Sequence, residues 1–362
     1  MSRVVFSKFR KINARIYPQH IFSPPEWLVL GVNNVCNLHC KMCDVGTQSN
    51  ETVFAQNLIG THPLNMPMAL FKRITDEAAA SFPKVKLGYA FTEPLMYSHL
   101  LESLQYAKSK NLETHITTNG LKLPQLAEEI CRAGLKGIYI SLDGVEQTHN
   151  EIRGHKLSFQ RAIEGIEKLL TQNNPPAISV FCTITEWNFS ELKLFAEYFM
   201  KYPIVQLGFM HNNFTSKNVA ATHNALWGHL YPATQSNIEE SNASCIDVTV
   251  LLEQIQEIHG KQFPFKVSFS PELNSAVQLD VFYNQPQKII GKICNDAFTN
   301  IMIKSDGSVI PAHGRCYNIT VGNIYQDSLK EIWNSQKLAG FRRDLIKANG
   351  LFPACSRCCS AF

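Results

Sequence analysis

The sequence predicts an α/β protein that consists of a partial (β/α)6 TIM-like barrel and a small C-terminal cysteine-rich domain. Two observations favour this fold class. Between residues 27 and 270, short apolar runs alternate with amphipathic stretches of helical length, which is typical of a parallel sheet with crossover helices. The cysteines gather near the two ends of the chain, and 362 residues are enough for one large and one small domain.

Six barrel strands are expected, each a short apolar run, with helices between them. The strands cover residues 27–32, 85–91, 113–117, 137–142, 178–184 and 205–210, and the helices lie near residues 67–81, 100–109, 124–133, 159–170 and 190–200. Asn65 is placed to cap the first helix with Pro67 just inside, and Pro124 opens the third at a position that needs no N–H. Gly134 is expected to end that helix. Functional side chains should gather where the strands end.

After the sixth strand the sequence predicts a long polar loop, a helix, a seventh strand and a hairpin. The loop covers residues 211–244, the helix 248–259, the strand 265–270, and the hairpin turns at Asp306-Gly307. The expected organisation is an N-terminal extension (1–26), the barrel (27–270), a linker (271–293) and the C-terminal domain (294–362).

Composition and charge exclude several classes of protein. Lys and Arg number 34 against 30 Asp and Glu, and no block of like charge stands out, so no nucleic-acid partner or acidic membrane surface is indicated. The longest apolar runs, such as 177–184, are far shorter than the ~20 residues of a membrane span. No apolar segment or cleavage site follows the basic N-terminus, so it is not a secretory signal. We expect a cytoplasmic protein with no membrane association.

Eleven cysteines are many for a reducing compartment, where disulfides rarely persist, so their clusters indicate metal or redox chemistry. Two isolated ones, Cys131 in a helical pattern and Cys182 in a strand pattern, are expected to be small buried hydrophobic residues.

Directly after the first strand, Cys36, Cys40 and Cys43 form a CxxxCxxC loop. Three thiolates at this spacing can bind three corners of a 4Fe-4S cubane and leave one iron open. A structural zinc site would normally have four ligands, with His39 as the alternative fourth.

With this loop after the first strand, residues 27–270 resemble the radical S-adenosylmethionine (SAM) superfamily. The resemblance implies that SAM chelates the open iron through its amino and carboxylate groups. One-electron cleavage of SAM would then give a 5'-deoxyadenosyl radical that takes a hydrogen atom from the substrate. It also implies an external electron donor such as flavodoxin or ferredoxin. Met42 stands where the family usually has an aromatic residue near the adenine.

Three strand ends carry further motifs of this family. Glu93, in the sequence Phe-Thr-Glu-Pro, stands in the place of the family's Gly-Gly-Glu-Pro and is the implied partner of the SAM ammonium, although both glycines are replaced. Asn119, in Thr-Asn-Gly, is implied near the SAM carboxylate or ribose. Ser141 and Arg153 resemble the residues that bind the ribose and the carboxylate.

The C-terminal cysteines, with the hairpin, a helix containing Trp-Asn and a closing CxxC, resemble the SPASM and twitch auxiliary-cluster domains over residues 294–362. The implied ligands of a second 4Fe-4S cluster are Cys294, Cys316, Cys355 and Cys358. This chain has Pro-Ala where the family has Pro-Cys, so His313 or Cys359 are alternatives. A zinc ribbon would also suit these cysteines. The sequence ends four residues after Cys358, which favours a single auxiliary cluster.

A closed second cluster suits electron transfer, so we expect oxidation of an alcohol in a sugar- or cyclitol-like small molecule. The alternatives are epimerisation, radical modification of a ribosomal peptide, and a non-catalytic iron-sulfur or zinc-binding protein. Cys245 is the candidate hydrogen donor for epimerisation, and His211, after the sixth strand, is the other catalytic candidate. Only about 26 residues precede the first strand, fewer than a fused leader-peptide domain needs, which favours a small-molecule substrate.

Overall fold

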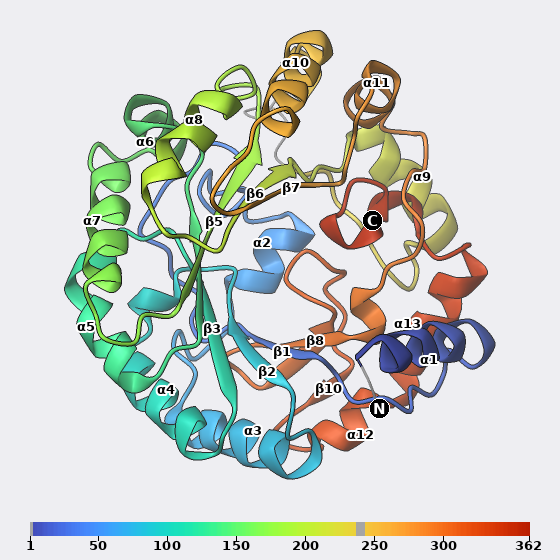
Figure 1. Cartoon of the computed structure of the whole chain (residues 1–362). Helices are drawn as coiled ribbons and strands as arrows, with labels where there is room; N and C mark the ends of the chain where they lie inside the picture. The colour runs from blue at the N-terminus through green and yellow to red at the C-terminus, as the bar shows by residue number, and fades with distance from the viewer. Residues whose placement is uncertain (1–2, 237–242) are drawn as a thin grey trace.

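One twisted sheet with helices around its outer face organises the molecule (Figure 1). The computed structural model describes residues 3–236 and 243–362. The strand order is β10-β9-β8-β1-β2-β3-β4-β5-β6-β7. The strands are β1 (Trp27–Leu30), β2 (Lys86–Tyr89), β3 (Glu113–Thr118), β4 (Gly137–Ser141), β5 (Ala177–Ile184), β6 (Gln206–His211), β7 (Lys266–Ser270), β8 (Asn300–Ile303), β9 (Ser308–Pro311) and β10 (Gly322–Asn323).

The predicted α/β barrel is confirmed, and it is wider than the six strands that the sequence indicated. β7 pairs parallel with β6, and β8 pairs parallel with β1. β9 and β10 then run antiparallel, with the expected hairpin turn at Gly307, whose φ is 79°. Because β8 continues the barrel sheet, the C-terminal residues share one sheet with the barrel.

The described residues form thirteen α-helices, of which seven lie where the sequence predicts a helix and six do not. They are α1 (Arg3–Ile16), α2 (Val53–Leu58), α3 (Met68–Ser81), α4 (Leu100–Ser109), α5 (Leu123–Ala133), α6 (Glu146–Arg153), α7 (Ser158–Leu170), α8 (Leu192–Tyr198), α9 (Lys217–Trp227), α10 (Val248–His259), α11 (Ala276–Asn284), α12 (Leu329–Trp333) and α13 (Gln336–Lys347). Pro124 lies in the first turn of α5, and Gly134 ends it at a φ of 89°, as expected. No helix in the described part of the chain is long and apolar enough to cross a membrane.

Three helices lie where the sequence suggested irregular chain. α9 interrupts the expected loop 211–244, α11 lies within the expected linker 271–293, and α1 lies in the N-terminal extension. α9 and α11 begin with serine caps, Ser216 and Ser275, whose side chains accept from main-chain N–H groups of the first turn. The expected cap at Asn65 is wrong, because its Oδ1 accepts from the Ser98 N–H at 3.1 Å instead.

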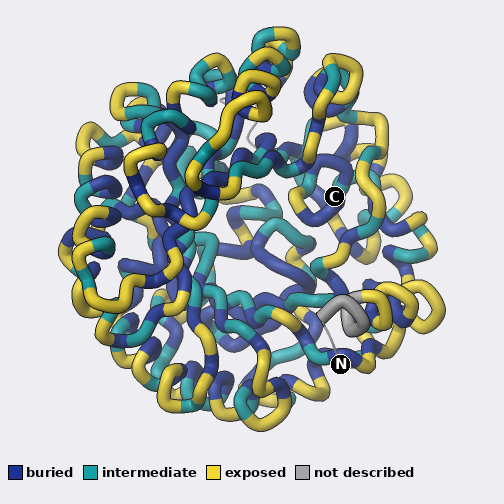
Figure 2. Tube along the Cα trace, in the orientation of Figure 1, coloured by how far each residue is buried: buried dark blue, intermediate teal, exposed yellow. Residues whose placement is uncertain are grey.

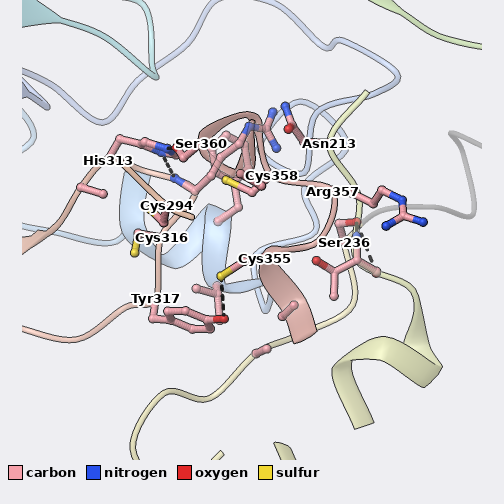
Figure 3. Close-up of a pocket in the computed structure, with 18 of the residues that line it drawn as sticks. Asn213, Ser236, Cys294, His313, Cys316, Tyr317, Cys355, Arg357, Cys358 and Ser360 are labelled. Atoms are coloured by element: carbon pink, nitrogen blue, oxygen red, sulfur yellow. Dashed lines mark hydrogen bonds between the residues drawn. The ribbon is translucent and has the colours of Figure 1, made fainter. Parts of the chain in front are cut away.

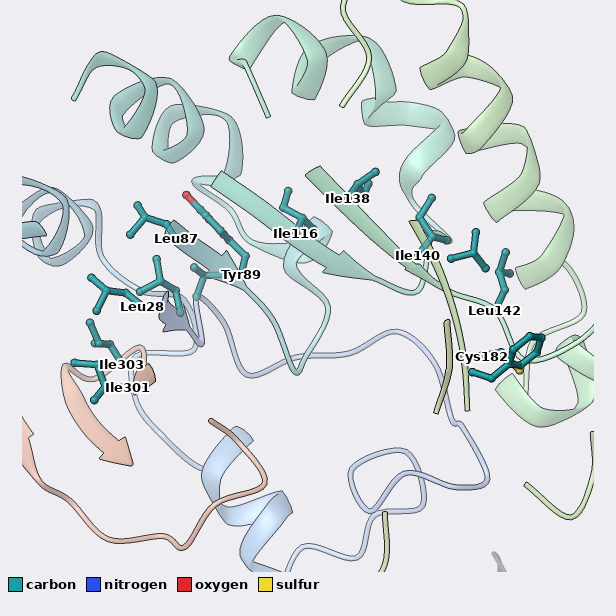
Figure 4. Close-up of a cluster of buried hydrophobic side chains, with 14 of the residues drawn as sticks. Leu28, Leu87, Tyr89, Ile116, Ile138, Ile140, Leu142, Cys182, Ile301 and Ile303 are labelled. Atoms are coloured by element: carbon teal, nitrogen blue, oxygen red, sulfur yellow. The ribbon is translucent and has the colours of Figure 1, made fainter. Parts of the chain in front are cut away.

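Outward-facing side chains of the strands form the main core with the helices. Leu87 is in register with Leu28, and Ile138 with Ile116, so buried aliphatic groups line up across the sheet (Figure 4). Cys182 is fully buried, as expected, whereas Cys131 is partly buried. Figure 2 shows buried chain along the sheet and exposed residues on the outer faces of the helices.

Inward-facing rings fill the end of the barrel where the strands begin. The ring centres of Trp27 and His115 are 5.0 Å apart, and those of His115 and Tyr139 are 5.9 Å apart. The Lys86 Nζ lies 5.2 Å from the centre of the Trp27 ring. With this end filled, space for a ligand remains at the carboxyl ends of the strands, as expected for a barrel of this kind.

Candidate functional site

The CxxxCxxC loop follows β1 and is held against the end of α6. The Lys41 N–H donates to the Ile152 carbonyl at 2.9 Å. Gly154 ends α6 at a φ of 66°, and a Cβ atom there would lie 2.8 Å from the His39 carbonyl oxygen. Only glycine takes this backbone conformation without strain and leaves room for the loop. The position of the loop therefore depends on α6 as well as on β1.

The three thiols of this loop differ in exposure and in polar neighbours. Cys40 is buried, with the Arg153 Nη1 3.8 Å from its Sγ, whereas Cys36 is exposed, with the Asn119 Nδ2 3.9 Å from its Sγ. Burial raises the pKa of Cys40 to about 12, and Arg153 opposes that rise. The loop carries three thiols, and two of them have donors that stabilise a thiolate. This donor set fits a 4Fe-4S cluster with one open iron.

Glu93 lies at the end of β2 with its carboxylate facing the start of the turn after β3. The carboxylate accepts from the Thr118 hydroxyl at 2.6 Å and from the N–H groups of Asn119 and Leu95 at 2.8 and 3.0 Å. Glu93 is 1% exposed, and this burial raises its pKa while the three donors oppose the rise. A carboxylate has about four acceptor positions, so one position remains for a further donor such as an ammonium.

Phe91, which stands where the family usually has a glycine, has a backbone conformation that favours glycine. Its φ is 83°, which is strained for a residue with a bulky side chain. The Phe91 ring stacks on His313 with centres 5.6 Å apart, and a Cβ atom on Gly314 would lie 2.9 Å from Phe91 Cγ. The replaced glycines therefore leave the turn in place, and the ring contacts the C-terminal cysteine region.

Arg153 joins α6 to β4 and to the cysteine loop. Its Nε lies 2.6 Å from the Asp143 Oδ2, and its Nη1 faces Cys40. Asp143 also accepts from the Thr183 N–H at 2.9 Å, which ties this pair to β5. Ser141 ends β4 on the inward face, with no hydrogen bond from its hydroxyl to another described residue. The expected SAM contacts of Arg153 and Ser141 remain predictions.

The four C-terminal cysteines proposed as ligands line one cavity of about 100 Å³ (Figure 3). They are Cys294, Cys316, Cys355 and Cys358. Burial raises the pKa of Cys355 to about 12, and the Tyr317 hydroxyl lies 3.3 Å from its Sγ. Four thiols around a single cavity are a suitable donor set for a closed cluster.

The two alternative ligands are placed differently. His313 lines the cavity, and its Nε2 lies 2.6 Å from the Ser360 hydroxyl. Cys359 is exposed and does not line the cavity. Potential ligand atoms of His313, Cys358 and Cys359 all lie within 4.8 Å of one another. His313 thus lines the cavity itself, and the Cys359 Sγ lies 4.0 Å from the His313 Nε2.

The same cavity reaches the segment that follows Cys43. Asp44, Thr52 and Phe54 line it together with the C-terminal cysteines, as do residues 213–215 after β6. A smaller polar hollow beside it contains Met42 and Arg315. Phe54 and Arg315 were not predicted from the sequence, because neither belongs to a recognisable motif. The C-terminal cysteines thus share a cavity with the segment that follows the first cysteine loop.

His211 and Cys245 do not line this cavity, and their catalytic roles remain predictions. His211 is 2% exposed, and its Nδ1 lies 2.6 Å from the hydroxyl of Tyr283 on α11, so it packs on the helix side of the sheet. The alternation of β6 explains this placement, since His211 falls in phase with the buried Leu207 and Phe209. Cys245 is exposed in a single turn and does not line the cavity of the C-terminal cysteines.

Comparison with known families gives two matches. Residues 31–199 match the radical SAM superfamily, and residues 294–359 match the SPASM iron-sulfur cluster-binding domain. The tungsten-containing aldehyde ferredoxin oxidoreductase cofactor-modifying protein of Pyrococcus furiosus is 24% identical over 92% of this chain and 87% of its own. The Fe-coproporphyrin III synthase of Methanosarcina barkeri is also 24% identical, over 91% of this chain and 80% of its own.

Solved structures show the same fold at low sequence identity. Streptococcus suis SuiB bound to precursor peptide SuiA matches with a TM-score of 0.61 and 16% identity, over 93% of this chain and 71% of that one. Native anSMEcpe with bound AdoMet and Cp18Cys peptide matches with a TM-score of 0.58 and 17% identity, over 88% and 82%. Enzymes of this kind use 4Fe-4S clusters and SAM. This chain belongs to the radical SAM superfamily and carries a SPASM cluster-binding domain.

Proposed function

We propose that this radical SAM enzyme oxidises its substrate within the space between the two cysteine groups. The observation that carries the proposal is the cavity lined by Cys294, Cys316, Cys355 and Cys358 on one side and by the segment after Cys43 on the other. When bound, SAM and its cluster supply a hydrogen-abstracting radical, and the second cluster supplies an acceptor for the remaining electron. Abstraction of the carbon-bound hydrogen atom, transfer of one electron to the second cluster and release of the hydroxyl proton to water would together convert an alcohol into a carbonyl.

In this proposal Cys36, Cys40 and Cys43 hold the first cluster. Arg153 stabilises Cys40 as a thiolate, since its guanidinium faces the Sγ from within the protein. Glu93 has one acceptor position left and receives the SAM ammonium there. Asn119 lies between Glu93 and Cys36 and orients the SAM carboxylate or ribose.

The second group of thiols holds the auxiliary cluster away from solvent. Cys294 is buried, and the half-buried Cys316 and Cys355 pack against the hydrophobic core. Tyr317 places its hydroxyl at the Cys355 Sγ, where a hydrogen bond to a ligating sulfur favours the reduced cluster. A buried cluster with such a donor is suited to accept an electron rather than to bind SAM.

Two substrate classes are compatible with this reaction. The first is a sugar- or cyclitol-like alcohol, supported by the polar side chains of Asn213, Thr234 and Ser236 on the cavity wall, which can hydrogen-bond hydroxyl groups. The second is a peptide, supported by the fold shared with SuiB and anSMEcpe, both of which have been solved with peptides.

Anaerobic reconstitution followed by incubation with SAM and dithionite tests the class of reaction. The wild-type chain should form 5'-deoxyadenosine, and Cys40→Ala should not, because its first cluster lacks a ligand. Cys131→Ala is the matched control, since Cys131 lies on α5 outside both cysteine groups. Absence of 5'-deoxyadenosine from fully iron-loaded wild-type protein would contradict the proposed function.

A further inference from the structure

Arg315 projects into the space between the two cysteine groups. It lies between His313 and Cys316 in the chain and lines both the main cavity and the adjoining polar hollow. Its guanidinium carbon is 4.3 Å from the centre of the Phe54 ring. A contact with an aromatic ring orients the guanidinium and leaves its N–H donors available for hydrogen bonds.

A second arginine of the same cavity shows how different this arrangement is. Arg357 donates to the main-chain carbonyls of Val281, Phe282, Gln285 and Lys288, and to its neighbour Ser356. A guanidinium has five N–H donors, and in Arg357 these bonds use all three nitrogens to hold the end of α11. Arg357 is therefore structural.

Arg315 has no such partners. Within residues 3–236 and 243–362, its guanidinium makes no hydrogen bond and no ion pair. It stacks on Phe54 and is near enough to Cys359 to interact electrostatically with that thiol. Asp44 lines the same hollow, but its Oδ2 accepts from the Thr52 hydroxyl at 3.0 Å and forms no ion pair with Arg315. A half-buried arginine whose donors are all unused is suited to bind an anion.

We propose that Arg315 binds a carboxylate group of the substrate, with Phe54 holding the guanidinium in place. The planar fork of arginine matches a carboxylate with two parallel hydrogen bonds. Asn213 and Ser236 lie across the cavity from His313 (Figure 3) and offer further donors beside this position. This inference rests on the proposed function, in which the substrate is oxidised in this cavity. It adds that the substrate carries a carboxylate group.

The carboxylate can belong to a small molecule or to a peptide, and one labelling experiment distinguishes these sources. Cluster-loaded protein is treated with phenylglyoxal, which modifies arginines with free guanidinium groups, and modification at each arginine is followed by peptide mass analysis. Succinate and succinamide are the small probes. N-acetyl-triglycine and its C-terminal amide are the peptide probes. Arg132, exposed on α5, and Arg357 serve as internal references.

Arg315 should react, and a carboxylate probe should slow its modification by at least about fivefold, while the matching amide has no effect. Arg132 should react equally with every probe, and Arg357 should stay unmodified. Stronger protection by succinate indicates a small acid, and stronger protection by the peptide acid indicates a peptide. Equal protection by acids and amides, or none by either acid, would overturn the inference.

A variant measures the same interaction independently. In Arg315→Gln, the dissociation constant of the protecting probe, measured by calorimetry, should rise by about tenfold or more. In Arg315→Lys, the dissociation constant should lie between those of the wild type and Arg315→Gln, because lysine keeps the charge but not the planar guanidinium. Arg132→Gln is the control and should bind the probe as the wild type does. Unchanged binding in both Arg315 variants would contradict the inference. Failure of the wild type to form 5'-deoxyadenosine would contradict the proposed function instead.

Discussion

At the scale of single residues, Glu93 offers the sharpest test of the SAM site. Its carboxylate accepts three hydrogen bonds from Thr118, Asn119 and Leu95 and has one position left. Glu93→Gln keeps the shape but removes the charge, so SAM binding should weaken and 5'-deoxyadenosine formation should fall by about tenfold or more. Iron content should remain that of the wild type.

The matched control for this test is Glu113→Gln, because Glu113 is an exposed carboxylate at the opposite end of the barrel sheet. It should leave SAM affinity and 5'-deoxyadenosine yield unchanged. Unchanged values in Glu93→Gln as well would mean that the strand-end motif is wrongly aligned with the family.

His211 gives a second prediction, on stability rather than on catalysis. Burial lowers its pKa from 6.5 to about 3, so between these values the unfolded chain binds a proton that the folded chain does not. Stability must then fall as the pH falls below 6.5, by about 1.4 kcal/mol for each pH unit. His211→Gln removes this pH-dependent contribution to stability. When the pH is lowered from 7.5 to 5.5, the free energy of unfolding measured with urea should therefore fall by about 1 kcal/mol less in the variant than in the wild type.

An identical pH dependence in His211→Gln would show that this histidine is not held neutral by burial.

Residues on a short loop were easier to predict than residues brought together from distant segments. The spacing of Cys36, Cys40 and Cys43 was enough to indicate a cluster, because local geometry decides whether three thiols converge. Arg315 and Phe54 meet across about 260 positions of sequence, and no local pattern signals such a pair. The end of β6 was predicted without the register, which determines that the His211 side chain contacts Tyr283 on α11.

At the scale of elements, the contact between α6 and the cysteine loop depends on one glycine. Alanine at Gly154 would require a φ of 66° and place Cβ 2.8 Å from the His39 carbonyl oxygen, so the loop would have to move. We expect Gly154→Ala to lose the first cluster selectively, and iron content should fall from about eight to about four atoms per chain.

Gly60 is a matched control because it also has a positive φ, 81°, but a Cβ atom added there would have no other atom within 4 Å. Gly60→Ala should lower the free energy of unfolding by about 1 kcal/mol through backbone strain and keep all its iron. Equal iron loss in both variants would mean that strain, and not contact with the loop, is responsible.

Helices with an apolar stripe were predicted well, whereas α9 was not. Its sequence is rich in Asn, Thr and His, and the buried side of the helix includes His223, which stacks on Tyr317 with ring centres 5.1 Å apart. α9 packs against the turn Pro353–Cys355, a partner that the local sequence does not reveal. The polar loop that the sequence suggested is thus partly a helix stabilised by tertiary contacts.

At the scale of the whole molecule, the pairing of β8 with β1 explains why the C-terminal cysteines share a cavity with the segment after the first cysteine loop. Asn300 is in register with Trp27, so the C-terminal hairpin continues the sheet beside the strand that carries the first cysteine loop. Periodicity predicts that a strand forms but not which strand it joins, and this pairing was therefore not foreseen. The shared sheet fixes the relative position of the two thiol groups.

The last prediction uses this arrangement to test the direction of electron flow. Cys355→Ala combined with Cys358→Ala should retain about four of about eight iron atoms and should still form 5'-deoxyadenosine. It should yield no oxidised product, because the substrate radical then has no neighbouring acceptor. Cys245→Ala should retain product formation, since Cys245 is exposed and does not line the cavity of the C-terminal cysteines. Turnover in heavy water separates the alternatives. An oxidised product lacks both removed hydrogens and gains no deuterium at the reacting carbon, whereas an epimerised product gains deuterium there from an exchangeable thiol. Full product formation by the double variant would show that the second cluster is not the acceptor.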